Sequence, residues 1–418
     1  METHKQLNIG LFGFGVVGEG LYKVLQKTPS LTASIKKVCI RTPSKKRDAP
    51  AELFTTDKND LLFDNDINVI VEVIDDADAA FDIVQTALRN GKSVVSASKK
   101  MIAEHLPELL QLQQETGLPF LYESSACASI PVIRNLEEYY DNDLLHAIKA
   151  IVNGSTNFIL TKMFEENLSF TEALLLAQQL GFAESNPALD VEGFDALNKW
   201  TILLNHAYGI VAHPSTLLFN GIQNIQLSDA LVAKEKSFDI KLVAQAKKLQ
   251  DGKVAAFVLP QFVKHDDHLS FVKNEYNGVV IESGFADKQF FYGKGAGSFP
   301  TASAVLSDIA ALRYGYKYEY KKLYHHTPHE LSNDFYLKVY VSFDDWKYIP
   351  RENFEWIEEW HAEAERKYLV GVVHVNVLRD SLWWKDNNTS LILSPEPIIE
   401  NLEIIKLKKR SLELAGVI

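Results

Sequence analysis

The chain of 418 residues has few cysteines and no long apolar run. Cys39 and Cys127 alone cannot build a disulfide framework, which favours a reducing, cytoplasmic compartment. The longest apolar candidate, residues 368–378, contains a histidine and an asparagine, whereas a membrane-spanning helix needs about 20 apolar residues. A strand pattern begins almost at once, which leaves no room for a signal peptide. These absences predict an intracellular protein without a membrane partner.

Positive charge is also in deficit. The chain has 43 Lys and Arg residues against 55 Asp and Glu residues, a net charge of −12, which argues against a partner made of nucleic acid. A hydrophobic fraction of 46% with 23% charged residues excludes wholesale disorder. At roughly 150 residues per domain, the length predicts two or three domains.

Strand and helix patterns alternate over about the first 125 residues. The segment 67–74 is an almost continuous apolar run, as is typical of a parallel strand covered on both faces. The alternation predicts a doubly wound parallel sheet, the Rossmann arrangement. Strands are expected at 7–12, 35–40, 67–74, 93–95 and 119–122, and helices at 19–27, 77–90 and 104–116.

A glycine-rich segment joins the first strand to the first helix. Gly13 would permit a tight turn, Gly15 would let the backbone approach a pyrophosphate, and Gly18 would permit close packing of helix on strand. The helix N-terminus would then face the phosphate charge. The alternative is a turn with a purely structural role. The residues predicted to bind a dinucleotide are Gly13, Phe14, Gly15, Val16, Val17 and Gly18.

The end of the second strand bears on which dinucleotide binds. An NAD site usually has Asp or Glu there, to accept from the ribose 2′-hydroxyl. This chain has Arg41 instead, followed by more cations up to Arg47. Arginine suits a 2′-phosphate, so NADP is predicted, with NAD as a possibility and a solvated basic loop as the alternative for the segment.

Two further regions follow the first domain, which is expected over residues 1–130. Helices at 158–166, 170–180, 196–208 and 301–313, with strands at 148–152, 254–259 and 290–292, predict an α+β domain over 131–315. An alternative expectation for the helix 301–313 is that it packs back on the first domain. A linker is expected at 314–331. A strand at 335–343, a helix at 353–367 and strands at 369–378 and 390–393 predict a small C-terminal α+β domain over 332–418.

An acidic loop of the middle region carries a candidate catalytic group. Glu184, Asp190 and Asp195 follow the helix stop at Gly181, and Asp195 begins the next helix. Lys199 is four residues further on, so Asp195 and Lys199 share a helix face. The plain alternative is a routine surface salt bridge. With the other two carboxylates nearby, the cluster is suited to hold the ammonium of an amino acid while a lysine faces the reacting oxygen.

Several segments in this order resemble the homoserine dehydrogenase family, which interconverts L-aspartate 4-semialdehyde and L-homoserine. The resemblance covers roughly residues 7 to 315. Its most specific part is the acidic loop from Glu184 to Lys199. The matching segments are Gly13–Gly18, Gly91–Lys99, Glu123–Pro131, Asn153–Asn157, Gly181–Lys199 and Gly295–Gly297 with Thr301–Ala302.

The resemblance implies roles for individual residues. Lys199 resembles the acid–base lysine, and Lys99 a second lysine where cofactor and substrate meet. Glu184 and Asp195 resemble the residues that bind the small-molecule substrate, with Asp190 close behind. Three more positions carry implied roles: Gly154 and Ser155 as donors to the substrate, and Gly297 as a cover over the nicotinamide end. Main-chain carbonyls would hold a monovalent cation, Na⁺ or K⁺, at Glu123, Ala126, Ala128 and Ile130.

The resemblance also implies a homodimer, built through the middle domain, and a C-terminal domain of the regulatory ACT type. The segment 344–350 lacks the glycine that would let backbone amides approach an amino-acid ligand, so an ACT-like or degenerate domain without useful threonine binding is predicted.

Two departures from the family lie near the cofactor. Ser96-Ala97-Ser98-Lys99 replaces Thr-Ala-Asn-Lys, and Asp75 and Asp76 replace paired glycines. Those carboxylates would either repel phosphates or bind ribose hydroxyls. They motivate a different hypothesis, a cofactor-binding pseudoenzyme with a regulatory or scaffolding role. Cys127, in an Ala/Ser-rich segment without a local histidine, is predicted to be a packed residue and not a nucleophile.

Overall fold

The computed structural model describes residues 6–141, 144–324, 327–363 and 366–403. The chain divides into two compact units. The first consists of Met1–Leu144, Leu197–Thr216 and Phe291–Pro328, and the second of Leu145–Ala196, Leu217–Phe290 and His329–Ile418. Each unit is therefore assembled from three separate stretches of the chain. Within the described ranges, no helix is long and apolar enough to cross a membrane.

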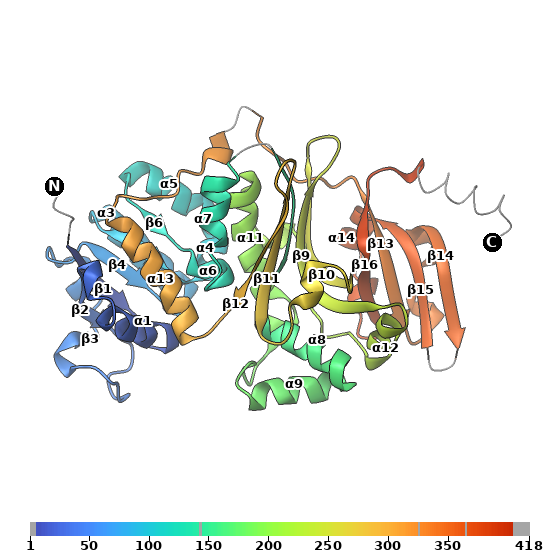
Figure 1. Ribbon diagram of the computed structural model, residues 1–418, viewed down its shortest axis with the longest axis horizontal. Helices are drawn as coiled ribbons and strands as arrows, with labels where there is room; N and C mark the ends of the chain where they lie inside the picture. The colour runs from blue at the N-terminus through green and yellow to red at the C-terminus, as the bar shows by residue number, and fades with distance from the viewer. Residues whose placement is uncertain (1–5, 142–143, 325–326, 364–365, 404–418) are drawn as a thin grey trace. The chain divides into compact units, whose positions relative to one another are not determined.

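The first unit contains a six-stranded parallel sheet in the order β3-β2-β1-β4-β5-β6 (Figure 1). Ile9 and Leu11 of the central strand β1 are fully buried and pair in register with Val69 and Val71 of β4. This order confirms the predicted doubly wound fold. The strands are β1 (Leu7–Phe12), β2 (Ala33–Cys39), β3 (Phe54–Thr55), β4 (Val69–Glu72), β5 (Ser93–Ser96) and β6 (Phe120–Leu121).

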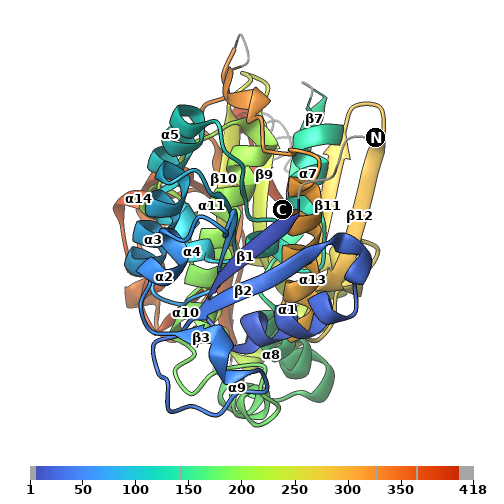
Figure 2. The same cartoon turned by 90° about the vertical axis from the view of Figure 1, so that its left-hand side faces the viewer.

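Helices cover both faces of this sheet (Figure 2). Helix α1 (Val16–Gln26) packs against α13 (Ser298–Leu312), whereas α3 (Ala77–Arg89) packs against α5 (Leu106–Thr116) on the other face. The helix expected at 104–116 is confirmed as α5, which begins at Leu106 with Pro107 in its first turn. A separate helix, α4 (Lys99–Glu104), precedes it and was not predicted. Proline suits a first helical turn and does not suit a helix interior.

The second unit is built on a mixed sheet in the order β12-β11-β7-β9-β10-β16-β13-β15-β14, with β8 paired to β10. The sequence prediction missed β9, which pairs along its whole length with β10. Helices α8 and α12 pack against β9. The elements of this half of the sheet are β7 (Leu145–Ile151), β8 (Leu218–Phe219), β9 (Phe238–Lys248), β10 (Val254–Lys264), β11 (Tyr276–Ser283), β12 (Asp287–Lys294), α8 (Gly154–Glu166), α9 (Phe170–Gln179) and α12 (Leu227–Glu235).

The C-terminal part of the second unit continues the same sheet through β16, β13, β15 and β14 (Figure 1). Phe257 of β10 shares one apolar core with Val339, Leu369 and the fully buried Trp384. The chain order is strand, two 3₁₀ turns, strand, strand, helix, strand, so short turns stand where an ACT domain has its first helix. The elements are β13 (Tyr336–Phe343), β14 (Phe354–Glu363), β15 (Arg366–His374), α14 (Val375–Asp380) and β16 (Thr389–Ile399).

The helix predicted at 353–367 is wrong, because residues 354–363 form strand β14. Its pairing with β15 shifts register between Phe354 and Trp356 and again between Ile357 and Glu359. Each shift interrupts the alternation of inward and outward side chains, so the apolar residues lose the period of two that identifies a strand.

Candidate functional site

The turn between β1 and α1 is shaped by glycines with different roles. Gly13 has φ of 96°, and a Cβ there would lie 2.9 Å from the carbonyl oxygen of Val73. A Cβ on Gly18 would lie 2.2 Å from the carbonyl oxygen of Gly13. Gly15, in contrast, is exposed, precedes α1, and has no protein atom within 4 Å of its virtual Cβ. The fold therefore requires Gly13 and Gly18, while Gly15 leaves space that the protein does not fill.

Residues from the far end of the first unit lie beside this turn. The Ser298 hydroxyl donates to the carbonyl of Val16 at 2.7 Å, and a Cβ on Gly20 would lie 2.5 Å from the same hydroxyl. Gly297, with φ of 115°, directly precedes α13. The structure thus brings Gly297 next to the glycine-rich turn, although about 280 residues separate them.

The two arginines of the basic segment after β2, Arg41 and Arg47, have different surroundings. Arg47 donates to the carbonyl oxygens of Lys45 at 2.6 Å and Thr42 at 2.8 Å, so it holds its own loop. Arg41 is exposed and lies two residues after Cys39, whose carbonyl accepts the amide of Gly13 at 3.0 Å. Of the cations in this segment, Arg41 is therefore the one nearest in sequence to the hydrogen bond that joins β2 to the glycine-rich turn.

A buried carboxyl that the sequence analysis missed organises the loop before Lys99. Glu72, at the end of β4, accepts the Ile74 amide at 2.7 Å and the Ser96 hydroxyl at 2.6 Å, and the Ser98 amide donates to Ser96 Oγ at 3.1 Å. Burial raises the pKa of Glu72 to about 7. The available signal was a charged residue in an otherwise apolar strand. Lys99 then begins α4.

The two aspartates that replace paired glycines differ in role. The Asp76 side chain accepts the Ala79 amide at 3.0 Å and caps the N-terminus of α3. Asp75 is exposed. One of the two carboxylates is thereby explained by helix capping, which stabilises a helix by about 1 kcal/mol.

In the second unit, Asn153 joins two of the predicted substrate carboxylates. Its side-chain oxygen accepts the Thr156 amide at 2.8 Å and caps α8. Its Nδ2 donates to Asp190 Oδ1 at 2.6 Å and to Asp195 Oδ2 at 2.8 Å. The sequence analysis did not choose Asn153 as a site residue; the signal was its place before a helix start. The buried asparagine holds two carboxylates that would otherwise repel each other.

Two helices place these carboxylates. Helix α10 (Ala188–Val191) holds Asp190, and Asp195 lies in the first turn of α11 (Phe194–Tyr208). Lys199 follows one turn later, and Asp195 and Lys199 are each 7% exposed. The plain alternative of a solvated surface pair is therefore excluded by burial.

The other predicted substrate residues flank this cluster. The Ser155 hydroxyl donates to the carbonyl of Phe182 at 2.6 Å, which ties the start of α8 to the loop that carries Glu184. Glu184 is exposed, and its main-chain carbonyl accepts from Gln178 at 2.9 Å. A Cβ on Gly154 would lie 2.5 Å from the carbonyl of Glu275, so this position requires glycine.

The segment expected to hold a cation surrounds the short helix α6 (Ser124–Cys127). The buried Glu123 carboxyl accepts the amides of Ile133 at 2.8 Å and Arg134 at 2.9 Å, so it is engaged with protein. Ala128 has φ of 44° and reverses the chain after α6. Main-chain oxygens are hard ligands that suit Na⁺ or K⁺. Within the described residues, no group of three or more His, Cys, Asp or Glu side chains is placed to hold a metal.

The segment 314–331 is more than a linker. Tyr318 and Tyr320 are buried, and the Tyr320 hydroxyl lies 2.9 Å from that of Tyr122. The buried His206 of α11 lies 3.0 Å from the Tyr122 hydroxyl and 2.6 Å from Glu137. These contacts, all within the first unit, fix the end of the helix that carries Lys199.

A parallel sheet in this order, a glycine-rich turn before α1 and a carboxylate cluster beside a helical lysine define a nicotinamide-dependent oxidoreductase. Family models described as "Homoserine dehydrogenase, NAD binding domain" and "Homoserine dehydrogenase" match residues 13–123 and 131–310. The homoserine dehydrogenase of Bacillus subtilis (strain 168) is 37% identical over 318 residues, 74% of this chain and 73% of that protein. The chain belongs to the homoserine dehydrogenase family.

Solved structures agree with this assignment. A homoserine dehydrogenase from Thiobacillus denitrificans superposes with a TM-score of 0.80 at 26% identity, over 93% of this chain and 98% of that one. A hyperthermophilic archaeal homoserine dehydrogenase in complex with NADPH matches with a TM-score of 0.64 at 28% identity, over 75% of this chain and 99% of that one. The chain is an enzyme that interconverts L-aspartate 4-semialdehyde and L-homoserine with a nicotinamide cofactor. Nothing in these matches supports the pseudoenzyme hypothesis.

Proposed function

We propose that Lys199 is the acid–base group of this reaction and that Asp190, Asp195 and Glu184 bind the substrate. The observation that carries the proposal is the Asn153 bridge between Asp190 and Asp195, one helical turn before a buried lysine. Two carboxylates held together suit the ammonium of an amino acid, and Lys199 follows Asp195 by one turn of α11.

In the proposed chemistry, the cofactor transfers the hydride and the protein transfers the proton. The nicotinamide, when bound, supplies or accepts the hydride. Lys199 Nζ donates a proton to the oxygen of the reduced carbon and accepts that proton in the reverse direction. Lys99, at the start of α4, is proposed to contact both cofactor and substrate, and the main-chain amides of Gly154 and Ser155 are proposed to donate to the substrate, because the Ser155 hydroxyl already donates to Phe182. Glu72 and Ser96 support this by ordering the loop before Lys99.

NADPH is the proposed cofactor, with NADH as the weaker one. The residues that would hold it are Gly13 to Gly18, Arg41 and Gly297. The proposal is supported by the exposed Arg41 after β2, by the space around Gly15 and by the NADPH complex of the archaeal relative. A monovalent cation, Na⁺ or K⁺, is proposed at the main-chain carbonyls of Glu123, Ala126, Ala128 and Ile130, because carbonyl oxygens are hard ligands that suit such an ion.

Domain limits, assembly and location are also proposed. The family models support a cofactor domain over 1–130 and a substrate domain over 131–315. The region 332–418, whose strands continue the sheet of the second unit, is proposed as the C-terminal domain. A homodimer through the middle domain is supported by its strand β12, which lies at the edge of the sheet and needs cover. Light scattering that gives a monomer of 47.1 kDa at micromolar concentration would contradict the dimer. The presence of only two cysteines in the sequence, Cys39 and Cys127, supports a cytoplasmic location, and the net charge of −12 supports the absence of a nucleic-acid partner.

We propose that the C-terminal domain does not respond to threonine, because 3₁₀ turns occupy the place of the helix after its first strand. Titration of L-threonine to millimolar levels during NADPH oxidation checks this. Cooperative inhibition that is lost on deleting 332–418 would contradict it.

The deciding experiment follows NADPH and NADH oxidation with L-aspartate 4-semialdehyde as substrate. Turnover that is faster with NADPH and that falls at least ~10²-fold in Lys199→Ala supports the proposal. Binding of NADPH without turnover, or an unaffected Lys199→Ala variant, contradicts it. Asn198→Ala, on the same helix and next to Lys199, is the matched control and is expected to keep activity.

A further inference from the structure

A buried lysine behind the substrate cluster has no part in the chemistry described above. Lys241, on β9, is 1% exposed, and its Nζ donates to Asn157 Oδ1 at 3.0 Å and to the carbonyl of Val272 at 2.6 Å. Full burial of an amine is expensive, and it lowers the pKa of Lys241 to about 7. An apolar side chain would fill this place at less cost in free energy, so the two hydrogen bonds are what distinguish lysine.

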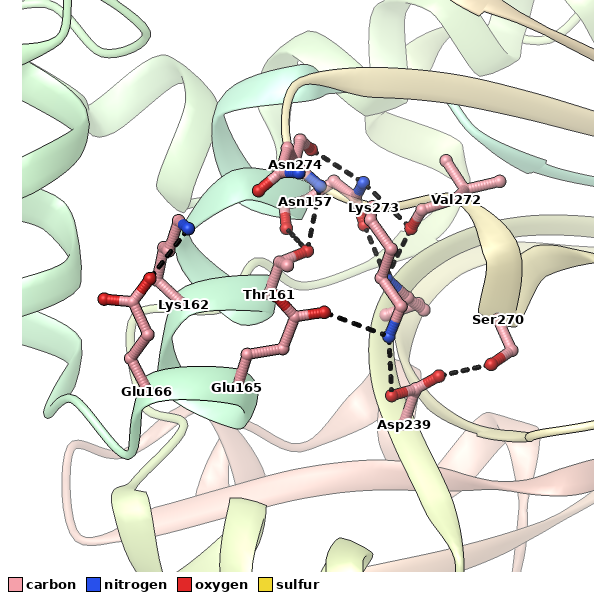
Figure 3. A network of polar contacts seen from close by, with 11 residues as sticks. Asn157, Thr161, Lys162, Glu165, Glu166, Asp239, Ser270, Val272, Lys273 and Asn274 are labelled. Atoms are coloured by element: carbon pink, nitrogen blue, oxygen red, sulfur yellow. Dashed lines mark hydrogen bonds and ion pairs between the residues drawn. The ribbon is translucent and has the colours of Figure 1, made fainter.

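Asn157 fastens a whole segment to α8. Its Nδ2 lies within hydrogen-bond distance of three carbonyls, those of Val272 at 3.2 Å, Asn274 at 2.8 Å and Tyr276 at 3.3 Å. One turn later, Thr161 Oγ1 donates to the Asn157 carbonyl at 2.6 Å and accepts the Asn274 amide at 3.1 Å. Figure 3 shows Asn157, Thr161, Val272 and Asn274 converging in this way. We use the name α8 clamp for the side chains of Lys241 and Asn157 together with the carbonyls of Val272, Asn274 and Tyr276 to which they donate.

The α8 clamp lies directly against the start of α8. A Cβ on Gly154 would lie 2.5 Å from the carbonyl of Glu275, so the segment 272–276 touches the residue after Asn153. Asn157 lies one helical turn from Asn153 and therefore on the same side of α8. A shift of the clamp would move the Asn153 amide, which has to meet Asp190 and Asp195 at 2.6 and 2.8 Å.

We propose that Lys241 is a positioning residue for substrate recognition: through Asn157 and the segment 272–276 it fixes the first turn of α8, and hence the Asn153 bridge between Asp190 and Asp195. The inference rests on the proposed function of that carboxylate cluster. It concerns the binding of the amino-acid end of the substrate and leaves the cofactor site, on the other unit, unaffected.

A second lysine of the same network supplies a matched control. Lys273 forms ion pairs with Asp239 at 3.2 Å and Glu165 at 3.7 Å, as Figure 3 shows, so its ammonium pairs with carboxylates rather than with Asn157. Lys273→Met therefore removes a positive charge from the same network without removing a hydrogen bond of the clamp. Lys241→Met removes both hydrogen bonds and preserves most of the side-chain volume.

The first readout is steady-state kinetics of the full-length enzyme. We expect Lys241→Met to raise the KM for L-aspartate 4-semialdehyde by roughly tenfold to a hundredfold, the scale of a small misplacement of binding groups. The Kd for NADPH of Lys241→Met should stay within about twofold of the wild-type value. In Lys273→Met, the KM for the semialdehyde and the Kd for NADPH should both stay at the wild-type values. Asn157→Ala should resemble Lys241→Met, and the double variant should be no worse than the poorer single variant, because both act through one clamp.

The second readout needs no substrate. Hydrogen exchange of the Thr156 and Asn274 amides, which bond to Asn153 and Thr161, should accelerate in Lys241→Met and stay slow in Lys273→Met. If the wild-type enzyme turned over no semialdehyde, the proposed function would fail, and this exchange would still decide whether the clamp exists. A wild-type KM in folded Lys241→Met, an equal KM rise in Lys273→Met, or additive losses in the double variant would overturn the inference.

Discussion

The cofactor turn and the substrate cluster use different means to reach a fixed geometry. At the turn, Gly13 and Gly18 have no room for a Cβ, so the chain is shaped by the absence of side chains. In the cluster, the side chain of Asn153 holds Asp190 and Asp195, and the α8 clamp supports Asn153 from behind. A backbone-built site is sensitive to added atoms, whereas a side-chain-built site is sensitive to lost hydrogen bonds. The two halves should therefore fail in different ways when mutated.

The largest expected effect lies in the substrate half. Lys199→Ala should lower kcat by at least ~10²-fold, because a positioned acid–base group is needed only in the transition state. The KM for the semialdehyde and the Kd for NADPH should change less. Stopped-flow or steady-state NADPH oxidation measures the loss. A variant with nearly normal kcat would remove Lys199 from the chemistry.

The glycine turn offers the sharpest contrast, because two similar substitutions should differ in stability. Gly15→Ala should weaken NADPH by about tenfold or more, which is about 1.4 kcal/mol of binding free energy, and should leave the Tm unchanged. Its new Cβ meets no protein atom within 4 Å. Gly18→Ala should lower both the affinity for NADPH and the Tm, since its Cβ would lie 2.2 Å from the carbonyl oxygen of Gly13. Calorimetric titration measures the affinity for NADPH, and thermal unfolding measures the Tm. An equal loss of Tm in Gly15→Ala and Gly18→Ala would contradict different roles for the two glycines.

Arg41→Asp should have a smaller and more selective effect. It removes a cation and adds a charge that repels the 2′-phosphate, so NADPH should weaken by about tenfold while NADH changes little. Titration of both cofactors against one protein preparation measures the ratio. Arg47→Ala is the control, because Arg47 already bonds its own loop at Thr42 and Lys45. Equal losses for NADPH and NADH would show that Arg41 does not discriminate between them.

The smallest expected effect is the pH dependence of stability at Glu72. Burial raises its folded-state pKa from 4.5 to about 7, so its contribution to stability is present at low pH and is lost as the pH rises towards 7 and above. Glu72→Gln, which stays neutral, should therefore gain in Tm relative to the wild type between pH 5 and pH 8. A difference in Tm that is constant across this range would contradict an ionising Glu72.

The same contrast explains what the sequence could predict. The fold of the cofactor half was predicted well, because glycine positions and a βαβ alternation are local signals. The sequence also singled out Asp190 and Asp195, which the structure brings to one asparagine. The sequence analysis missed three residues that support the sites through hydrogen bonds: Asn153, which bonds Asp190; Glu72, which bonds Ser96; and Lys241, which bonds Asn157. Each has its partner between 24 and 84 residues away in the sequence.

Errors in secondary structure had equally particular causes. Strand β14 was predicted as a helix because two register shifts removed its alternation. The segment 314–331 was predicted as a linker because its composition is aromatic and charged, and that composition does not identify His206 and Tyr122 as the buried partners of its tyrosines. Long-range packing supplies these contacts, and no local pattern encodes them.

The measurement that tests the account most directly is a pair of constants for Asn153→Ala: the KM for L-aspartate 4-semialdehyde and the Kd for NADPH. Loss of the amide leaves Asp190 and Asp195 without their bridge, so the KM should rise by roughly tenfold to a hundredfold. The Kd for NADPH should stay within about twofold, because the cofactor turn is built from backbone. An unchanged KM, or a KM and a Kd that rise together, would contradict a substrate cluster held by Asn153 independently of the cofactor turn.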